Sequence, residues 1–160
     1  MKGLKTGVVT IALLVSSAGL AGEGVSSTVL GTNDALAAGS RALQLGSYDE
    51  GIRLTQRGLA SETRRLQRAR GFSNLCAGYA GTREYDKALG ACGEALALND
   101  RNWRAFNNLA LTLTGLGRAH EARRALARAF ELRPDSPTLQ QTRAWIDERA
   151  PRVMLAGASD

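Results

Sequence analysis

The 160-residue sequence has little proline, little cysteine and few aromatic residues, namely 3 Pro, 2 Cys and 5 % Phe, Trp and Tyr. This composition excludes collagen and the disulfide-dense mini-proteins, and a hydrophobic content of 44 % excludes a disordered chain. Because so few aromatic residues leave a core of Ala, Leu and Gly, the composition favours closely packed helices over a β-sandwich or barrel. At this length we expect a single domain.

The sequence also lacks the patterns that are typical of enzymes. Its one histidine, His120, is expected to be solvated at the start of a helix. There is no HExxH or GxSxG motif, no glycine-rich phosphate loop after a strand, and no paired spacing of metal ligands. We therefore expect no enzymatic activity, no catalytic residue, no metal, no cofactor and no small-molecule substrate.

The first 21 residues have the three-part layout of a secretory signal peptide. A short basic start is followed by an apolar run over 7–15 and by small residues up to Ala21. This layout predicts cleavage after Ala21 and a periplasmic or secreted protein. The alternative is an uncleaved membrane anchor, although the run is shorter than the roughly 18 apolar residues of a membrane span.

The net charge of +6 falls once this segment is removed, because Lys2 and Lys5 are lost and 19 basic residues remain against 15 acidic ones. The arginines are scattered along the predicted helices beside Glu and Asp, without interleaved aromatic residues. This pattern does not predict a nucleic-acid partner. Contact with an acidic envelope component is the alternative, and its densest candidate is the run 64–70.

Internal repetition organises the rest of the chain. A shift of 34 residues superposes Phe72 on Phe106 and Leu75 on Leu109, and a shift of 37 residues aligns Tyr48 with Tyr85. Within each unit the apolar residues recur every three or four positions, stop at a short polar or glycine-containing stretch, and resume. The sequence therefore predicts three units of two helices each, over about 34–60, 69–102 and 103–136.

These units resemble tetratricopeptide repeats over residues 34–150. The motifs that carry the resemblance are Leu75-Cys76 with Tyr79, Leu109-Ala110 with Leu113, Ala88 with Ala95, Ala122 with Ala129, and Arg133-Pro134. The first unit departs from the pattern, with Gly51 and Gly58 in place of Ala. The resemblance implies an all-α, right-handed superhelix of about three helix-turn-helix repeats.

A helix over 137–149 is expected to cap the array. Ser136 is a good N-cap residue, and Pro137 suits the first helical position. One side of this helix is apolar and the other polar, as a terminal element of stacked repeats requires. We expect a flexible linker over 22–33 and a flexible tail over 151–160.

The two cysteines fall on the two helices of one predicted hairpin. If the repeat assignment holds, Cys76 and Cys92 face each other, and a disulfide between them would suit an oxidising compartment. The alternative is a pair of buried thiols that act as small hydrophobic groups.

The resemblance also implies a peptide-binding groove along the first helix of each unit. Its expected lining is Arg70, Ser73, Asn74, Ala77, Arg104, Asn107, Asn108 and Leu111, with Leu36 and Ser40 in the first unit. Asparagine pairs with an extended backbone, and arginine holds a carboxylate. The match to the carboxylate-clamp subgroup is partial, because the first unit lacks the basic residue and the Asn. Ordinary solvation of these helices is the alternative.

Together these patterns predict an exported, non-enzymatic scaffold that binds a protein or peptide in its concave groove and serves an envelope or periplasmic assembly. The alternative is a structural subunit that an uncleaved N-terminal segment anchors in an inner-membrane complex. Such a subunit would dock through its convex face or its ends.

Overall fold

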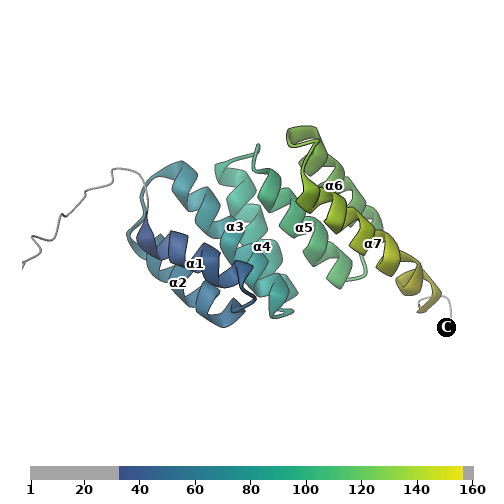
Figure 1. Ribbon diagram of the computed structural model, residues 1–160, viewed down its shortest axis with the longest axis horizontal. Helices are drawn as coiled ribbons and strands as arrows, with labels where there is room; N and C mark the ends of the chain where they lie inside the picture. The colour runs from purple at the N-terminus through teal and green to yellow at the C-terminus, as the bar shows by residue number, and fades with distance from the viewer. Residues whose placement is uncertain (1–32, 157–160) are drawn as a thin grey trace, which may run out of the picture. The chain divides into compact units, whose positions relative to one another are not determined.

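The computed structural model describes residues 33–156, with side chains up to residue 149, and this part of the chain contains seven α-helices and no strand. Figure 1 shows them in chain order from the purple N-terminal helix to the yellow C-terminal one. Their bounds are α1 Asp34–Gln44, α2 Tyr48–Ser61, α3 Arg65–Gly81, α4 Tyr85–Leu98, α5 Trp103–Gly115, α6 Ala119–Leu132 and α7 Pro137–Ala156.

Each odd-numbered helix after the first packs on both helices of the preceding hairpin. Helices α1 and α2, α3 and α4, and α5 and α6 form the three hairpins. Helix α3 contacts α1 and α2, α5 contacts α3 and α4, and α7 contacts α5 and α6. The prediction of three helix-turn-helix units followed by a terminal helix is confirmed.

The same turn closes all three hairpins. The residue at its left-handed position is Gly46, Arg83 or Gly117, with φ of 76°, 65° and 74°. The next residue donates its backbone N–H across the turn to the carbonyl five positions earlier, at 2.8 to 2.9 Å. This is the Schellman arrangement, which favours glycine because a left-handed φ strains any residue with a Cβ. The middle hairpin carries that strain at Arg83.

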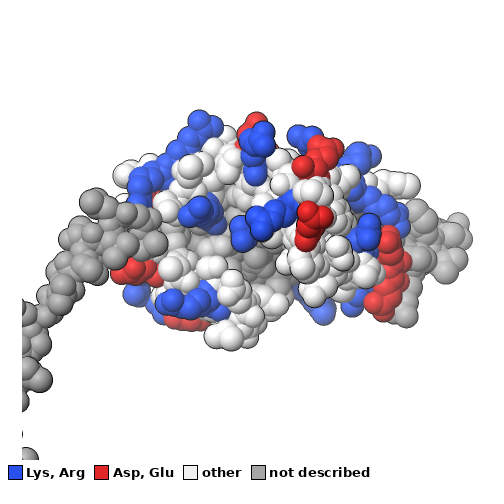
Figure 2. All heavy atoms as spheres, turned by 45° about the horizontal axis from the view of Figure 1, so that its top comes forward, with Lys and Arg blue, Asp and Glu red and all other residues white. Residues whose placement is uncertain are grey.

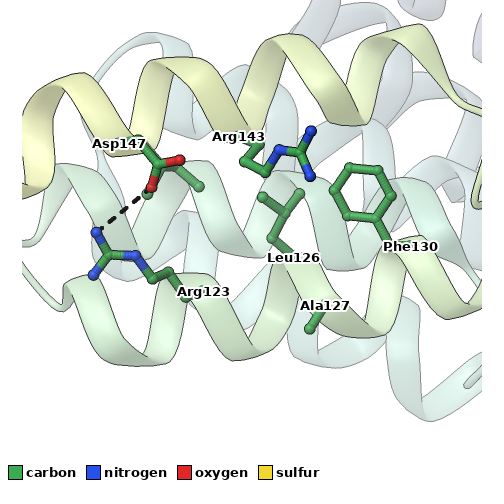
Figure 3. A pocket seen from close by; sticks show the side chains of 7 residues that line it. Arg123, Leu126, Ala127, Phe130, Arg143 and Asp147 are labelled. Atoms are coloured by element: carbon green, nitrogen blue, oxygen red, sulfur yellow. Dashed lines mark ion pairs between the residues drawn. The ribbon is translucent and has the colours of Figure 1, made fainter.

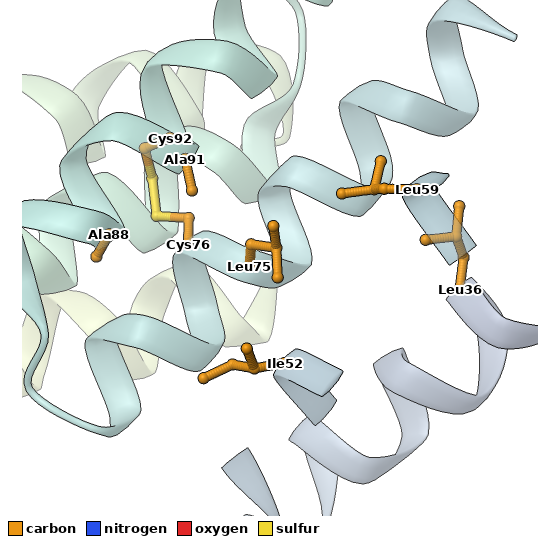
Figure 4. Close-up of a cluster of buried hydrophobic side chains, with 8 residues drawn as sticks. All are labelled: Leu36, Ile52, Leu59, Leu75, Cys76, Ala88, Ala91 and Cys92. Atoms are coloured by element: carbon orange, nitrogen blue, oxygen red, sulfur yellow. A yellow bond between two sulfur atoms is a disulfide. The ribbon is translucent and has the colours of Figure 1, made fainter. Parts of the chain in front are cut away.

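One pair of facing positions is filled differently in each hairpin. In the middle hairpin the pair is Cys76 and Cys92, which a disulfide joins with their Cα atoms 5.1 Å apart (Figure 4). In the first hairpin the pair is Gly39 and Thr55. A Cβ added at Gly39 would lie 2.4 Å from the Thr55 hydroxyl and 3.0 Å from the Thr55 backbone N, so only glycine fits.

In the third hairpin these positions hold Ala110 and Leu126, both buried in the C-terminal core cluster. In the first and third hairpins a small residue thus faces a larger one, which lets the two helices pack closely without a void. The scarcity of aromatic residues is consistent with this seam, because the buried core is made mainly of Ala and Leu.

Two helix boundaries differ from the sequence-based expectation. Helix α3 begins at Arg65 rather than near residue 69. The added turn is built of helix-forming residues, and Arg65 Nε donates to the carbonyl of Leu98 at the end of α4, 2.8 Å away.

Helix α7 continues to Ala156, past the expected end at residue 149 and through Pro151. A proline has no backbone N–H to donate and its ring crowds the carbonyl four residues earlier, yet the helix continues beyond Pro151 to Ala156. Asn33, which the sequence placed in a linker, instead caps α1: its side chain accepts a hydrogen bond from the Leu36 backbone N.

The predicted signal segment 1–21, the linker residues 22–32 and the last four residues of the predicted tail lie outside the described residues. Among the helices that the structure does describe, none is long and apolar enough to cross a membrane.

Candidate functional site

A groove of about 510 Å³ runs beside the first helices of the three repeats. Four of the eight predicted groove residues, namely Arg70, Ser73, Asn74 and Arg104, line it, and Leu36 and Ser40 line it from α1. The groove therefore lies where α1, α3 and α5, the first helices of three successive repeats, turn the same face outward.

The capping residues of α1 and α5 form part of the groove wall. Asn33 and Asn102 each accept a hydrogen bond from the backbone three positions on, and each uses its amide NH₂ on a neighbouring helix. Asn33 Nδ2 donates to the Gly58 carbonyl at 2.9 Å, and Asn102 Nδ2 donates to the Ala69 carbonyl at 3.4 Å. The N-caps thus fix the helix ends that carry the groove.

A buried carboxylate supports the first of these caps. Glu62 accepts from Arg64 Nη2 at 2.8 Å, Arg64 Nε at 2.9 Å and the Arg64 backbone N at 2.9 Å, and Asn33 Nδ2 lies 3.4 Å away. The hydrogen bonds from the Arg64 side chain, and then from its backbone, hold the pKa of Glu62 at about 2. This network locks the joint between α2 and α3 beside the groove.

Two asparagine side chains tie neighbouring repeats together. Asn74 Nδ2 donates to the Leu36 carbonyl in a long bond of 3.5 Å, and Asn108 Nδ2 donates to the Ser73 carbonyl at 2.9 Å. Both bonds join equivalent positions of successive repeats. The Asn74 amide oxygen remains available as an acceptor on the groove wall, since no hydrogen bond to it occurs within the described residues.

Three arginines give the groove lining its positive charge. Arg70, Arg101 and Arg104 line the groove, and none of the described residues in its lining is acidic. The Arg104 guanidinium lies 4.4 Å from the Trp103 ring centre, and Arg133 approaches the same ring from 5.9 Å. Burial of the Arg104 guanidinium, followed by repulsion from Arg133 and Arg70, lowers its pKa below the usual arginine value.

The other four predicted residues do not line the groove. Ala77 and Leu111 are half-buried, and Asn108 is committed to the tie between repeats. Asn107 does not lie on the groove wall as predicted, because it is only 5 % exposed. Its amide oxygen has no hydrogen-bond partner in the described part of the chain. Its equivalent one repeat earlier, Ser73, is equally buried and contacts Asn108 of the next repeat, so the equivalence of repeats predicts that Asn107 faces α7.

Sequence reasoning missed the groove residues that come from the joints between repeats. These are Asn33, Asn99, Arg101, Asn102 and Trp103. The N-cap pattern could have found two of them. Asn33 stands directly before α1 and Asn102 directly before α5, just as Ser136 stands before α7.

The basic run 64–70 is largely committed to the fold. Arg64 pairs with Glu62, Arg65 bonds to the end of α4, and Arg68 donates to the Glu62 carbonyl at 3.1 Å. Arg70 alone of these arginines lines the groove. Figure 2 shows Lys and Arg spread along the viewed face, with Asp and Glu among them, rather than gathered over one element.

His120 is exposed at the start of α6. Within the described residues no three His, Cys, Asp or Glu side chains are grouped so that they could hold a metal ion.

Residues 79–146 match the family model described as tetratricopeptide repeat. The chain has the tetratricopeptide-repeat fold. No curated protein sequence matches the chain. Among solved structures, a tetratricopeptide-repeat-like protein from Chlorobium tepidum superposes with a TM-score of 0.64 at 24 % identity, covering 74 % of this chain and 91 % of that one.

Two domains of human RPAP3 share the tetratricopeptide-repeat fold with this chain. The first domain has a TM-score of 0.64 and 20 % identity, covering 75 % of this chain and 92 % of its own. The second, solved in complex with the HSP70 peptide SGPTIEEVD, has a TM-score of 0.55 and 22 % identity, covering 71 % of this chain and 96 % of its own.

Proposed function

We propose that this protein is a non-enzymatic module that holds an acidic, extended peptide segment of a partner protein in its groove. The observation that carries the proposal is the lining: the described residues that surround about 510 Å³ include three arginines and several amide side chains, and none of these residues carries a carboxylate. Uncompensated guanidinium groups on a concave wall favour a carboxylate ligand, which each can bind with two parallel hydrogen bonds.

The geometry suits an extended backbone with acidic side chains. Arg70 and Asn74 lie one helical turn apart on α3, so a carboxylate held by Arg70 brings the neighbouring peptide N–H toward the Asn74 amide oxygen. Ser40 adds a hydroxyl group on the same wall. The peptide that the second human RPAP3 domain holds is itself acidic, which supports a ligand of this class here.

The full carboxylate clamp of the resemblance is not proposed. In the first repeat the positions equivalent to Arg70 and Asn74 are Asn33 and Ala37, so the basic residue is missing there. Arg70 and Asn74 on α3, together with Arg104 on α5, replace it. We therefore place the acidic part of the ligand over α3 and α5 and its neutral part over α1.

A groove variant tests the proposal. Arg70→Ala with Arg104→Ala removes two groove cations, and Arg57→Ala with Arg124→Ala removes two exposed cations elsewhere. In a pull-down from envelope extract, the first variant is expected to lose the partner that the wild type and the second variant recover. Equal recovery by all three proteins would overturn the proposal.

We propose further that the protein acts after export, in the periplasm or outside the cell. The disulfide between Cys76 and Cys92 supports this, because such bonds persist in oxidising compartments. Cleavage after Ala21 would shorten the protein by about 2 kDa. An intact mass of 17.0 kDa for the protein isolated from its host would instead favour the membrane-anchored alternative.

A further inference from the structure

A second pocket lies away from the groove, between α6 and α7 (Figure 3). It encloses about 240 Å³, and the side chains of Leu126, Phe130 and Ile146 line it. Ala127 opens its α6 side, because a methyl group leaves room that a larger side chain would fill.

The rim of this pocket carries an excess of positive charge. Arg123 reaches Asp147 across the pocket at 3.6 Å, which is a long ion pair. Arg143 lies over the Phe130 ring, 5.4 Å from its centre, and makes no ion pair with a carboxylate of the described residues. A ligand with an apolar part and an acidic group would pack its apolar part on Leu126, Phe130 and Ile146 and pair its acidic group with Arg143.

The pocket is unsuited to a further helix of the array. A shift of 34 residues places Arg143 and Asp147 of α7 where α5 has Leu109 and Leu113, the residues on which α6 packs in its hairpin. A helix laid on α7 in the same way would bury these charged groups at a high cost in free energy. The occupant is therefore a short projection and not another repeat.

The same chain carries such a projection at its other end. Leu45, in the turn between α1 and α2, is 82 % exposed and is the most exposed large apolar side chain in the described residues. Its equivalent in the third repeat, Leu116, is only 36 % exposed. Four residues after Leu45 comes Asp49, which makes no ion pair with any described residue, whereas Glu50 is bonded to Arg53.

We propose that this turn of one copy docks into the α6 and α7 pocket of a second copy. Leu45 enters between Phe130 and Ile146, and Asp49 pairs with Arg143. Apolar burial supplies the attraction, and the opposite charges at the rim fix the orientation.

Because the two surfaces differ, each copy retains a free turn or a free pocket after it has docked. Such a head-to-tail contact propagates from copy to copy instead of closing into a symmetric pair. One leucine and one ion pair form a small contact compared with the roughly 1,200 Å² or more of a stable complex. The association is therefore weak, reversible and dependent on concentration.

Sedimentation velocity of the purified protein across a concentration series tests the proposal. The wild type is expected to show a sedimentation coefficient that rises with concentration. Leu45→Asp, which removes the projection, and Ala127→Trp, which fills the pocket, are each expected to remain monomeric. Leu66→Asp changes another exposed leucine, at 62 % exposure, and is expected to behave as the wild type.

Mixing the two blocked variants distinguishes a head-to-tail contact from any symmetric one. The Leu45→Asp copy keeps its pocket and the Ala127→Trp copy keeps its projection, so an equal mixture is expected to form one-to-one dimers that grow no further. A wild type that stays monomeric throughout, or a mixture that stays monomeric, overturns the proposal. Arg70→Ala with Arg104→Ala is expected to associate as the wild type, so this test is independent of the peptide groove.

Discussion

Loss of the disulfide in the middle hairpin should lower the free energy of unfolding by about 3 kcal/mol. Cys76 and Cys92 are 16 residues apart in sequence, and the loop-closure entropy of a chain of that length gives this magnitude. For a folded unit of this size, the same loss corresponds to a fall in Tm of about 10 °C.

Urea unfolding followed by circular dichroism, with and without a reducing agent, measures the effect. Cys76→Ala with Cys92→Leu is the matched variant, because it places in the middle hairpin the pair that the third hairpin already uses, Ala110 and Leu126. We expect this variant to unfold at a lower urea concentration than the oxidised wild type and to be insensitive to the reducing agent.

The reasoning fails if the oxidised and the reduced wild type unfold at the same urea concentration. Cys76→Ala with Cys92→Ala separates packing from the covalent bond. It loses the bond and also leaves space in a fully buried seam, so it should be less stable than the Ala and Leu variant.

Three further predictions concern single positions. The pKa of Glu62 is about 2 in the folded protein, against about 4.3 in an unfolded chain. The ionised carboxylate therefore stabilises the fold above about pH 4.3, and this effect is lost as the pH falls toward 2. The Tm advantage of the wild type over Glu62→Gln should shrink in that range. Arg83→Gly relieves the left-handed φ of 65° and should stabilise the protein by about 1 kcal/mol in urea unfolding. Gly39→Ala drives a Cβ into the buried Thr55 hydroxyl and tightly against the Thr55 backbone, and it should destabilise the protein by about 1–3 kcal/mol in the same assay.

Each of these predictions has a contrary outcome. A Tm difference for Glu62→Gln that stays constant between pH 5 and about 2 would contradict the assigned pKa. Arg83→Gly is compared with Gly90→Ala, a helix position whose added Cβ meets no atom within 4 Å. If Arg83→Gly destabilises the protein, strain at the turn is not the dominant effect. A neutral Gly39→Ala would show that α1 and α2 can separate without cost.

The repeated part of the fold was predictable because residues that recur at a fixed spacing in the sequence make the same contacts in each repeat. The spacing of Phe72, Leu75 and Tyr79 defined a helix face, and the period of 34 residues placed its equivalents one hairpin later. The same logic predicted that Cys76 and Cys92 face each other across one hairpin, where the disulfide joins them.

The groove was only partly predictable, because a helix face is known from periodicity but its neighbours are not. Asn107 and Asn108 are adjacent in sequence, yet one is buried and the other spans to the preceding repeat. The contribution of the joints, such as Arg101 and Trp103, depends on how the chain turns between hairpins, which periodicity does not describe. The length of α7 depends on whether a helix tolerates Pro151, which tertiary packing decides.

The hydrogen bonds of Asn74 and Asn108 make the spacing between repeats independent of the side chains at the residues that accept these bonds. Asn74 and Asn108 reach backbone carbonyls, at a leucine in one case and a serine in the other. A bond to the backbone is indifferent to the side chain at the accepting residue. Substitution of the accepting residues Leu36 and Ser73, which both line the groove, can therefore change the ligand preference while the bond that sets the distance between repeats is kept.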